Sequence, residues 1–306
     1  MLKLPIFKQI THISPSSFQQ WLQCEYKTFL IRQSGLPFIP SPSSLYAEIG
    51  TCFDAFVKEY IMKKRGMKIP ALKLAYTMNK IKHPAAIEEG RKAAIAYVKT
   101  PLVHQFLTAS EVHLEQELTS RHGVSNEGYV GILGRIDAIV DGRVVEWKCR
   151  GWSSQTSCYP GYSDRYDCQY ATGSIMQRPQ HDKLSEVEEF SFEWATQLLF
   201  YNWLLRNNPR EYEIHEIVKR DDGIVIVQHK GCISEEFEKR VTGMLAAMWE
   251  NLTGGFYHTS IDKPNPCRET CHKWGNVCEV SEHCEYYREW LKNNGEPKEP
   301  NFEELI

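Results

Sequence analysis

The chain contains no apolar run approaching the roughly 20 residues that a membrane helix needs, so no membrane partner is predicted. Its first ten residues, MLKLPIFKQI, lack the long apolar core of a secretory signal, and we expect a cytoplasmic protein. Internal repeats and low-complexity tracts are also absent. The formal net charge is −3, so the overall charge does not indicate a nucleic-acid partner. The 306 residues are enough for one large domain or two modest ones.

Positive charge is concentrated in one region. Residues 58–99 hold eleven Lys and Arg against three Glu. This stretch is typical either of a helical arm that faces phosphates or of an ordinary solvated helix face. The sequence leaves both interpretations open.

The segment GRIDAIVDGRVVEWK, residues 134–148, predicts a β-hairpin. Asp141 and Gly142 both tolerate positive φ, which a two-residue hairpin turn requires. With this turn, residue 138 pairs with 145, and Asp137 lies opposite Glu146. Opposed side chains on one sheet face are roughly 4.5–5.5 Å apart at Cβ. The apolar residues of the opposite face are expected in the core: Ile136, Ala138, Val145 and Trp147.

Two carboxylates at that distance repel unless a cation lies between them. Lys148 follows Glu146 by two residues and therefore points to the same face. A divalent metal on two carboxylates beside a lysine is suited to phosphodiester hydrolysis. The alternative is a surface hairpin with ordinary cross-strand ion pairs.

Periodicity predicts further helices and strands along the chain. A helix is expected over 14–33 with Cys24 inside it, and a second over 44–64 contains Gly50 and Asp54. A third helix, over 192–207, places Gln197 and Tyr201 on one face at i, i+4 spacing. Strands are expected over 112–120, 129–140, 143–150, 213–220 and 223–231, with a helix over 234–255. Residues 151–190 are interpreted as a long loop or lid.

Ten cysteines in a cytoplasmic protein are unlikely to form a disulfide framework. Four of them, Cys267, Cys271, Cys278 and Cys284, cluster near the end of the chain and indicate a metal site. Their spacing, C-x3-C-x6-C-x5-C, is looser than the paired knuckles of zinc ribbons. It therefore favours an iron–sulfur cluster over Zn²⁺, which remains the alternative.

Taken in order, these motifs resemble the RecB-like branch of the PD-(D/E)XK nucleases. The most similar layout is that of the iron–sulfur exonucleases of the CRISPR-associated, AddB-type and phage-encoded kind. GRID matches the motif that ends in Asp137, EWK supplies Glu146 and Lys148, and QLLFY supplies Gln197 and Tyr201. SPSSFQQWLQCEYKTFL resembles the N-terminal helix with its single cysteine.

The resemblance implies an α/β fold, with a restriction-endonuclease-like core whose mixed central sheet is flanked by helices. It implies a single nuclease domain over 1–306. Within it, 1–105 form an N-terminal helical part, 106–262 the nuclease core, and 263–306 a cysteine-cluster segment with an acidic tail.

Two features depart from the family pattern. Asp54 stands four residues after Gly50, where the family has a metal-binding histidine; an aspartate is also a good oxygen ligand for Mg²⁺ or Mn²⁺. The second departure is an additional C-terminal cysteine. The family pattern assigns a [4Fe–4S] cluster to Cys24, Cys271, Cys278 and Cys284, whereas a local quartet would use Cys267 in place of Cys24.

The expected activity is divalent-metal-dependent exonucleolytic hydrolysis of DNA, on single strands or ends, with a helicase or recombination factor as a further partner. Asp54, Asp137, Glu146 and the backbone carbonyl of Trp147 are the predicted ligands of Mg²⁺ or Mn²⁺. Lys148 is expected to orient water, and Gln197 and Tyr201 to contact the substrate or support the lysine. Either Glu115 or Glu117 is expected to lie next to the metal ligands without contacting the metal itself. Two other functions remain open: a non-catalytic nucleic-acid-binding module, and a zinc-stapled endonuclease.

Overall fold

The computed structural model describes residues 2–3, 6, 8–36, 44–68, 77–124, 128–150, 168–171, 174–177, 191–220, 223–254, 256–257, 281–284, 288 and 292. The chain divides into two compact units. Unit 1 comprises 1–41, 119–133 and 239–306, and unit 2 comprises 42–118 and 134–238. The predicted single domain with three consecutive parts stays a prediction.

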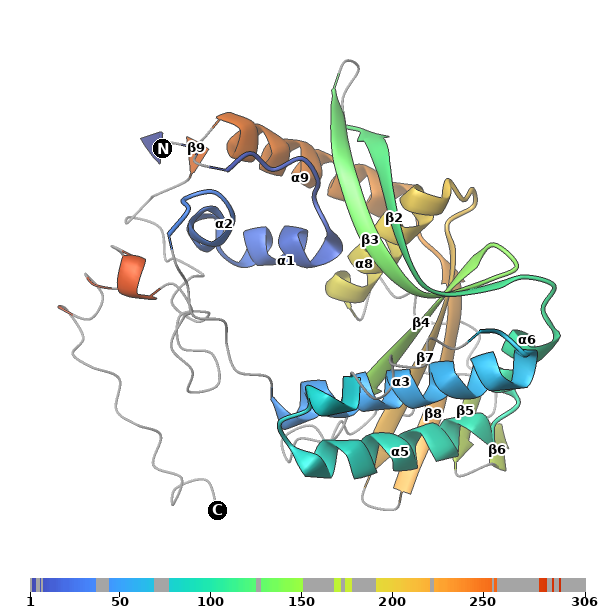
Figure 1. Ribbon diagram of the computed structural model, residues 1–306. Helices are drawn as coiled ribbons and strands as arrows, with labels where there is room; N and C mark the ends of the chain where they lie inside the picture. The colour runs from blue at the N-terminus through green and yellow to red at the C-terminus, as the bar shows by residue number, and fades with distance from the viewer. Residues whose placement is uncertain are drawn as a thin grey trace. The chain divides into compact units, whose positions relative to one another are not determined.

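A seven-stranded mixed sheet carries the candidate site, which confirms the predicted α/β fold class (Figure 1). Its strands, in spatial order, are β2 (Val112–Gly123), β3 (Tyr129–Val140), β4 (Arg143–Arg150), β7 (Glu211–Arg220), β8 (Gly223–Cys232), β5 (Cys168–Ala171) and β6 (Ser174–Gln177). Strands β4 and β7 run parallel, whereas β3 with β4 and β7 with β8 are antiparallel.

The predicted hairpin is present. Asp141 and Gly142 have φ values of 46° and 81°, as a two-residue turn of this kind requires. The β3–β4 register pairs Val140 with Arg143 and Ala138 with Val145. Asp137 and Glu146 follow directly beyond this last pair, so the turn brings both carboxylates to the end of the ladder.

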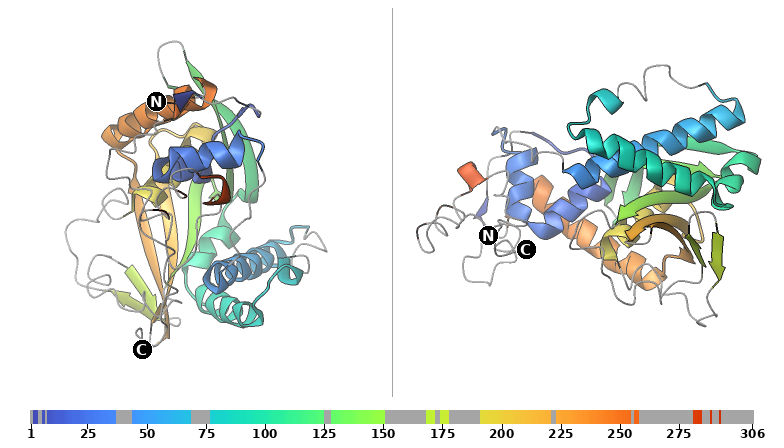
Figure 2. Two further views of the ribbon diagram at one scale, coloured as in Figure 1. Left: turned by 90° about the vertical axis from the view of Figure 1, so that its left-hand side faces the viewer. Right: turned by 90° about the horizontal axis from the view of Figure 1, so that it is seen from below.

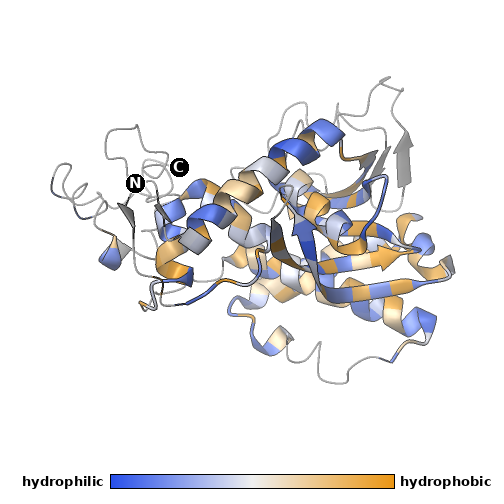
Figure 3. Ribbon diagram, turned by 90° about the horizontal axis from the view of Figure 1, so that it is seen from above, coloured by the Kyte–Doolittle hydropathy of each residue, from blue (hydrophilic) through white to orange (hydrophobic). Residues whose placement is uncertain are grey.

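Helices cover both faces of this part of the sheet. Helices α3 (Leu45–Arg65) and α5 (Pro84–Val98) lie side by side (Figure 2). Together with α6 (Leu102–Thr108) they pack against Val145 and Trp147. Glu146, which alternates with those residues along β4, instead contacts α8 (Phe192–Leu205). Helix α8 therefore lies on the face opposite α3 and α5. The alternation of apolar and polar residues along the strands is visible in Figure 3.

Cys24 interrupts the predicted helix over 14–33. The structure has α1 (Pro15–Gln23) and α2 (Glu25–Arg32), with Cys24 between them in an extended conformation (φ −162°, ψ 108°). Ser14 and Ser17 form a reciprocal capping box at the start of α1. At the start of α2 the Lys27 backbone N–H donates to Sγ of Cys24 at 3.3 Å, so the thiol caps the second helix. Periodicity alone could not show this break, because apolar residues recur on both sides of it.

The remainder of unit 1 contains the greater part of α9 (Glu235–Gly254) and a two-stranded sheet formed by β1 (Leu2–Lys3) and β9 (Phe256–Tyr257). The buried Gln33 side chain donates to the Leu252 carbonyl at 2.8 Å and ties the end of α2 to α9. Among the described residues, no helix is long and apolar enough to cross a membrane.

The predicted loop over 151–190 contains two short strands. Strand β5 pairs antiparallel with β8, through Gln169 with Val227 and Ala171 with Val225, and β6 pairs with β5. Outside these strands, the segment lies beyond the described residues. Cys267, Cys271 and Cys278 also lie outside them, followed by a short 3₁₀ turn, η3 (Ser281–His283).

Gly134, the first residue of GRID, sits against α8. A Cβ there would be 2.6 Å from Cδ1 of Leu204 and 3.0 Å from Cε1 of Tyr201. The absence of a side chain thus allows α8 to approach β3 closely enough for Tyr201 to reach the site.

We expect Gly134→Ala to lower the free energy of unfolding by about 1–3 kcal/mol, the usual cost of overpacking. Gly243→Ala is the matched control, because a Cβ on Gly243 in α9 meets nothing within 4 Å. The free energy of unfolding of the control should rise by about 0.5–1 kcal/mol, since glycine is unfavourable inside a helix. Urea unfolding followed by circular dichroism measures both. Equal shifts for the two variants would contradict the packing role of Gly134.

Candidate active site

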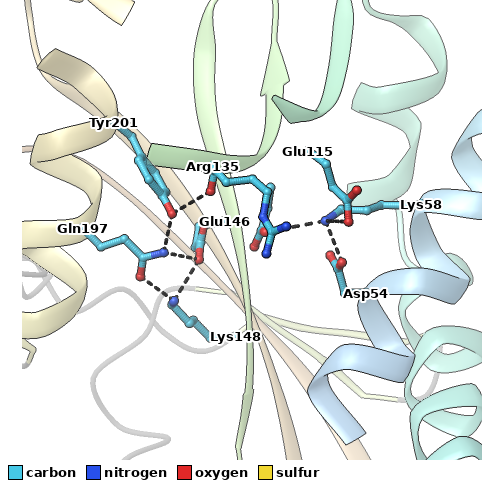
Figure 4. Close-up of polar contacts among 9 residues, drawn as sticks. Asp54, Lys58, Glu115, Arg135, Glu146, Lys148, Gln197 and Tyr201 are labelled. Atoms are coloured by element: carbon cyan, nitrogen blue, oxygen red, sulfur yellow. Dashed lines mark hydrogen bonds and ion pairs between the residues drawn. The ribbon is translucent and has the colours of Figure 1, made fainter. Parts of the chain in front are cut away.

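The candidate active site lies in unit 2, at the end of the β3–β4 ladder (Figure 4). Its polar groups come from five elements: Asp54 and Lys58 from α3, Glu115 from β2, Asp137 and the backbone carbonyl of Arg135 from β3, Glu146 and Lys148 from β4, and Gln197 and Tyr201 from α8.

A hydrogen-bonded ring joins β4 to α8. Lys148 Nζ donates to Oε1 of Glu146 at 2.8 Å and to Oε1 of Gln197 at 2.7 Å. Gln197 Nε2 donates to the same Glu146 oxygen at 2.8 Å and lies 2.7 Å from the Tyr201 hydroxyl. The hydroxyl in turn donates to the backbone carbonyl of Arg135 at 2.9 Å. The predicted i, i+4 pair on α8 therefore holds the lysine and the glutamate in fixed positions.

Glu146 is buried, and its second oxygen, Oε2, accepts no hydrogen bond from the residues that the structure describes. Burial, reinforced by the charge of Asp137, raises its pKa to about 8. The neighbouring carboxylates therefore repel, as the hairpin register implies, and without a further cation Glu146 keeps a proton at neutral pH.

Lys148 remains charged. Burial acts to lower its pKa, but the surrounding carboxylates, Glu146 first and then Asp137 and Glu193, together raise it. An ammonium donates hydrogen bonds and accepts none, so Lys148 can orient a nucleophile or stabilise negative charge but cannot accept a proton.

Lys58 is a member of the site that the sequence did not single out. Its Nζ lies 2.6 Å from Oδ2 of Asp54, 3.4 Å from Oε1 of Glu115 and 3.6 Å from Oδ1 of Asp137. Only 6% of its side chain is exposed, whereas Lys63 on the same helix is 64% exposed. Lys58 begins the basic stretch 58–99, and neither a phosphate-facing arm nor a solvated face describes it. The i, i+4 spacing of Lys58 from Asp54 was the one feature of the sequence that linked this lysine to a candidate site residue.

Glu115 faces the site, while Glu117 is exposed. The backbone of Glu115 has φ 53°, which is rare for a residue other than glycine. Such an irregularity breaks the regular alternation along β2, which is why strand parity could not choose between the two acids. Strained backbone of this kind concentrates at functional sites.

Among the residues that the structure describes, no three carboxylate, thiol or imidazole groups converge as they would around a metal ion. Asp54 and Glu115 instead contact Lys58, and so does Asp137, which also faces Glu146. The ligand role of Asp54 stays a prediction, and so does that of the Trp147 carbonyl, whose side chain packs in the core.

Of the predicted cluster cysteines, the structure describes Cys24 and Cys284. Cys24 accepts the Lys27 N–H described above, and Cys284 is buried. An N–H donated to sulfur suits a thiolate ligand, because such bonds stabilise negative charge on the sulfur.

No family model and no curated protein matches the chain. Among solved structures, the chain is similar to a crystal structure named "Putative exonuclease" from Eubacterium rectale, with 11% identity and a TM-score of 0.52 over 97% of this chain and 93% of that chain. A second structure, SSO0001, is 14% identical with a TM-score of 0.32, over 88% of this chain and 96% of that one. At these identities the first likeness shows a shared fold alone, and the second carries no argument.

The raised pKa of Glu146 predicts a pH dependence of stability. In the unfolded chain this carboxyl ionises near its ordinary value of 4.5, whereas the folded protein retains the proton up to about 8. Folding therefore binds a proton within this window, and metal-free stability falls as the pH rises through it.

Glu146→Gln removes the ionisable group and should eliminate this contribution. The free energy of unfolding of the variant, relative to the parent, should increase steadily from pH 5 to pH 8.5 in the presence of a chelator. Glu88→Gln, an exposed position on α5, is the control. A constant difference between Glu146→Gln and the parent across this range would contradict the proposed carboxylate repulsion.

Proposed function

We propose that the protein is a divalent-metal-dependent deoxyribonuclease of the RecB-like PD-(D/E)XK kind. The observation that carries the proposal is the facing pair of Asp137 and Glu146 with Lys148 held beside it. The named similarity to an exonuclease fold supports a nuclease, and the order of motifs along the chain supports this branch.

The donor set fits Mg²⁺ or Mn²⁺. Both ions prefer carboxylate and carbonyl oxygens, which Asp137, Glu146 and the backbone of Trp147 would provide. The buried Oε2 of Glu146, which accepts no hydrogen bond within the described chain, is available as a ligand atom. When bound, such an ion polarises the scissile phosphate and lowers the pKa of coordinated water.

The protein's own groups would divide the remaining work. The Lys148 ammonium, which hydrogen-bonds to Glu146 and Gln197, would hold the attacking water and stabilise the charge that develops on the phosphate. Tyr201 keeps Gln197 in place through their 2.7 Å contact. The water oxygen would form a bond to phosphorus while the bond from phosphorus to the sugar oxygen breaks. The proton that the water loses balances the proton that the leaving sugar oxygen gains, with solvent as the carrier.

Arg150 extends this surface along β4. Arg150 is two residues after Lys148 and therefore lies on the same face of the strand. Its guanidinium lies 4.3 Å from the ring centroid of Trp194. The buried carboxylate of Glu216 lies 3.6 Å away, and 34% of the Arg150 side chain is exposed. A partly exposed guanidinium held in this way is suited to contact the DNA backbone phosphate next to the scissile one.

The proposal includes exonucleolytic action on single strands or DNA ends, a [4Fe–4S] cluster that staples the fold, and delivery of substrate by a helicase or recombination partner. The N-cap position of Cys24 supports the cluster through its N–H···S contact. The order of the motifs supports the exonuclease assignment.

Lys148→Ala should lower the rate of DNA cleavage by about 10²–10³-fold, the typical effect of removing one charge-stabilising donor. The variant should still bind Mn²⁺, because an ammonium is not a metal ligand. Glu146→Ala should lose both cleavage and Mn²⁺ binding. Digestion of end-labelled DNA and calorimetric titration with Mn²⁺ measure the two properties.

Lys219→Ala is the matched control, since Lys219 is 44% exposed and pairs with Glu89 at 2.9 Å. It should keep both properties. Cleavage by Glu146→Ala at the parent rate would show that the site is misassigned. Absence of cleavage by the parent in Mg²⁺ and in Mn²⁺ would favour a non-catalytic binding module.

Cys24→Ala should release the cluster, which anaerobic purification reports as lost iron and lost brown colour. The melting temperature should also fall, because metal binding to a site absent from the unfolded chain adds to folding stability. Cys267→Ala should change neither property, and Cys232→Ala, at an exposed position, is a control. The reverse pattern would show that Cys267, not Cys24, is the fourth ligand. Zinc without iron in the parent would show that the cysteines bind Zn²⁺ in place of a cluster.

A further inference from the structure

The ammonium of Lys58 lies among the carboxylates of Asp54, Glu115 and Asp137, a cluster that we call the acidic pocket. Three carboxylates, those of Asp54, Glu115 and Asp137, lie within 3.6 Å of its Nζ. The shortest contact, to Asp54, spans one turn of α3 and is 2.6 Å long. Carboxylates from α3, β2 and β3 thus each contact a cation that belongs to the chain itself.

Several contacts hold the Lys58 side chain in a defined position. Lysine is seldom buried unless it is paired, and the side chain of Lys58 is only 6% exposed. The ring of Trp147 lies under the ammonium, 5.7 Å from Nζ to the centroid. The backbone of Glu115 has a positive φ, and its side chain contacts Lys58.

The formal charges around Lys58 balance with a single divalent ion. The four carboxylates of the site are Asp54, Glu115, Asp137 and Glu146, and the two ammonium groups in contact with them are Lys58 and Lys148. The Arg135 side chain is exposed to solvent and is left out of this count. When all are ionised they leave two negative charges, which one divalent ion neutralises. A second ion in the pocket would leave an excess of positive charge beside the Lys58 ammonium, and this repulsion disfavours it.

We infer that Lys58 takes the place of a second metal ion, so that the site binds one divalent ion, between Asp137 and Glu146. The inference rests on the proposed function in taking that ion to be the metal of a nuclease. In this arrangement Asp54 and Glu115 hold Lys58, and Asp137 lies between the two cations. Lys58 would be a positioning residue, since it contacts Asp137, a proposed metal ligand, and would not contact the substrate.

Counting bound Mn²⁺ in the full-length protein tests the inference. Calorimetric titration, with free Mn²⁺ followed by electron paramagnetic resonance, should give one ion per chain for the parent. Lys58→Met keeps the length of the side chain and removes its charge, so the emptied pocket should admit a second Mn²⁺. The control Lys63→Met, on the exposed face of α3, should bind one ion. Two ions in the parent, or one in Lys58→Met, would overturn the inference.

Asp54→Asn provides a second test should Lys58→Met fail to fold. If Asp54 serves Lys58, this variant should still bind one Mn²⁺, with an affinity within about threefold of the parent. Loss of the ion, or a more than tenfold weaker affinity, would make Asp54 a metal ligand and overturn the assignment.

DNA digestion with the same preparations separates this inference from the proposed function. A parent that binds one ion and cleaves no DNA would contradict the nuclease and leave the ion count standing. A parent that cleaves DNA with two bound ions would support the nuclease and exclude the role of Lys58.

Discussion

Repulsion between the carboxylates of Asp137 and Glu146 is the constraint around which the site is built. The hairpin turn at Asp141 and Gly142 fixes the register and so brings the two groups together at the end of the β3–β4 ladder. Burial of Glu146 adds a second and larger penalty on its charge, because the low dielectric of the interior disfavours an ionised carboxyl. Each other polar group of the site either offsets this negative charge or fixes a group that does.

The fold provides these groups from both faces of the sheet. Helix α8 packs on one face, where the absence of a side chain on Gly134 leaves room for Tyr201, and it contributes Gln197 to the ring around Lys148. Helix α3 packs on the other face and contributes Lys58. The two helices are distant in sequence, and the sheet between them brings the side chains that they contribute to one site.

Local sequence rules predicted the parts of the site that depend on neighbouring residues. The register of the hairpin followed from its turn, and the pairing of Gln197 with Tyr201 followed from helical periodicity. Features that depend on tertiary packing or on irregular backbone were not accessible in this way. Lys58 could not be separated from the exposed lysines of its stretch, since its burial is set by distant strands. The break at Cys24 and the positive φ of Glu115 both depart from regular periodicity, on which the sequence rules rest.

The two lysines of the site differ in what surrounds them, and this difference assigns their tasks. Three carboxylates contact Lys58, whose side chain is 6% exposed, so its charge is already compensated by the protein. Lys148 contacts one carboxylate and one amide, and 21% of its side chain is exposed. An ammonium with fewer partners and more access can exchange a protein contact for water or phosphate at a smaller loss of electrostatic energy. If the protein is the nuclease proposed above, Lys148 would contact the substrate and Lys58 would stay with its three carboxylates, although both residues carry the same chemical group.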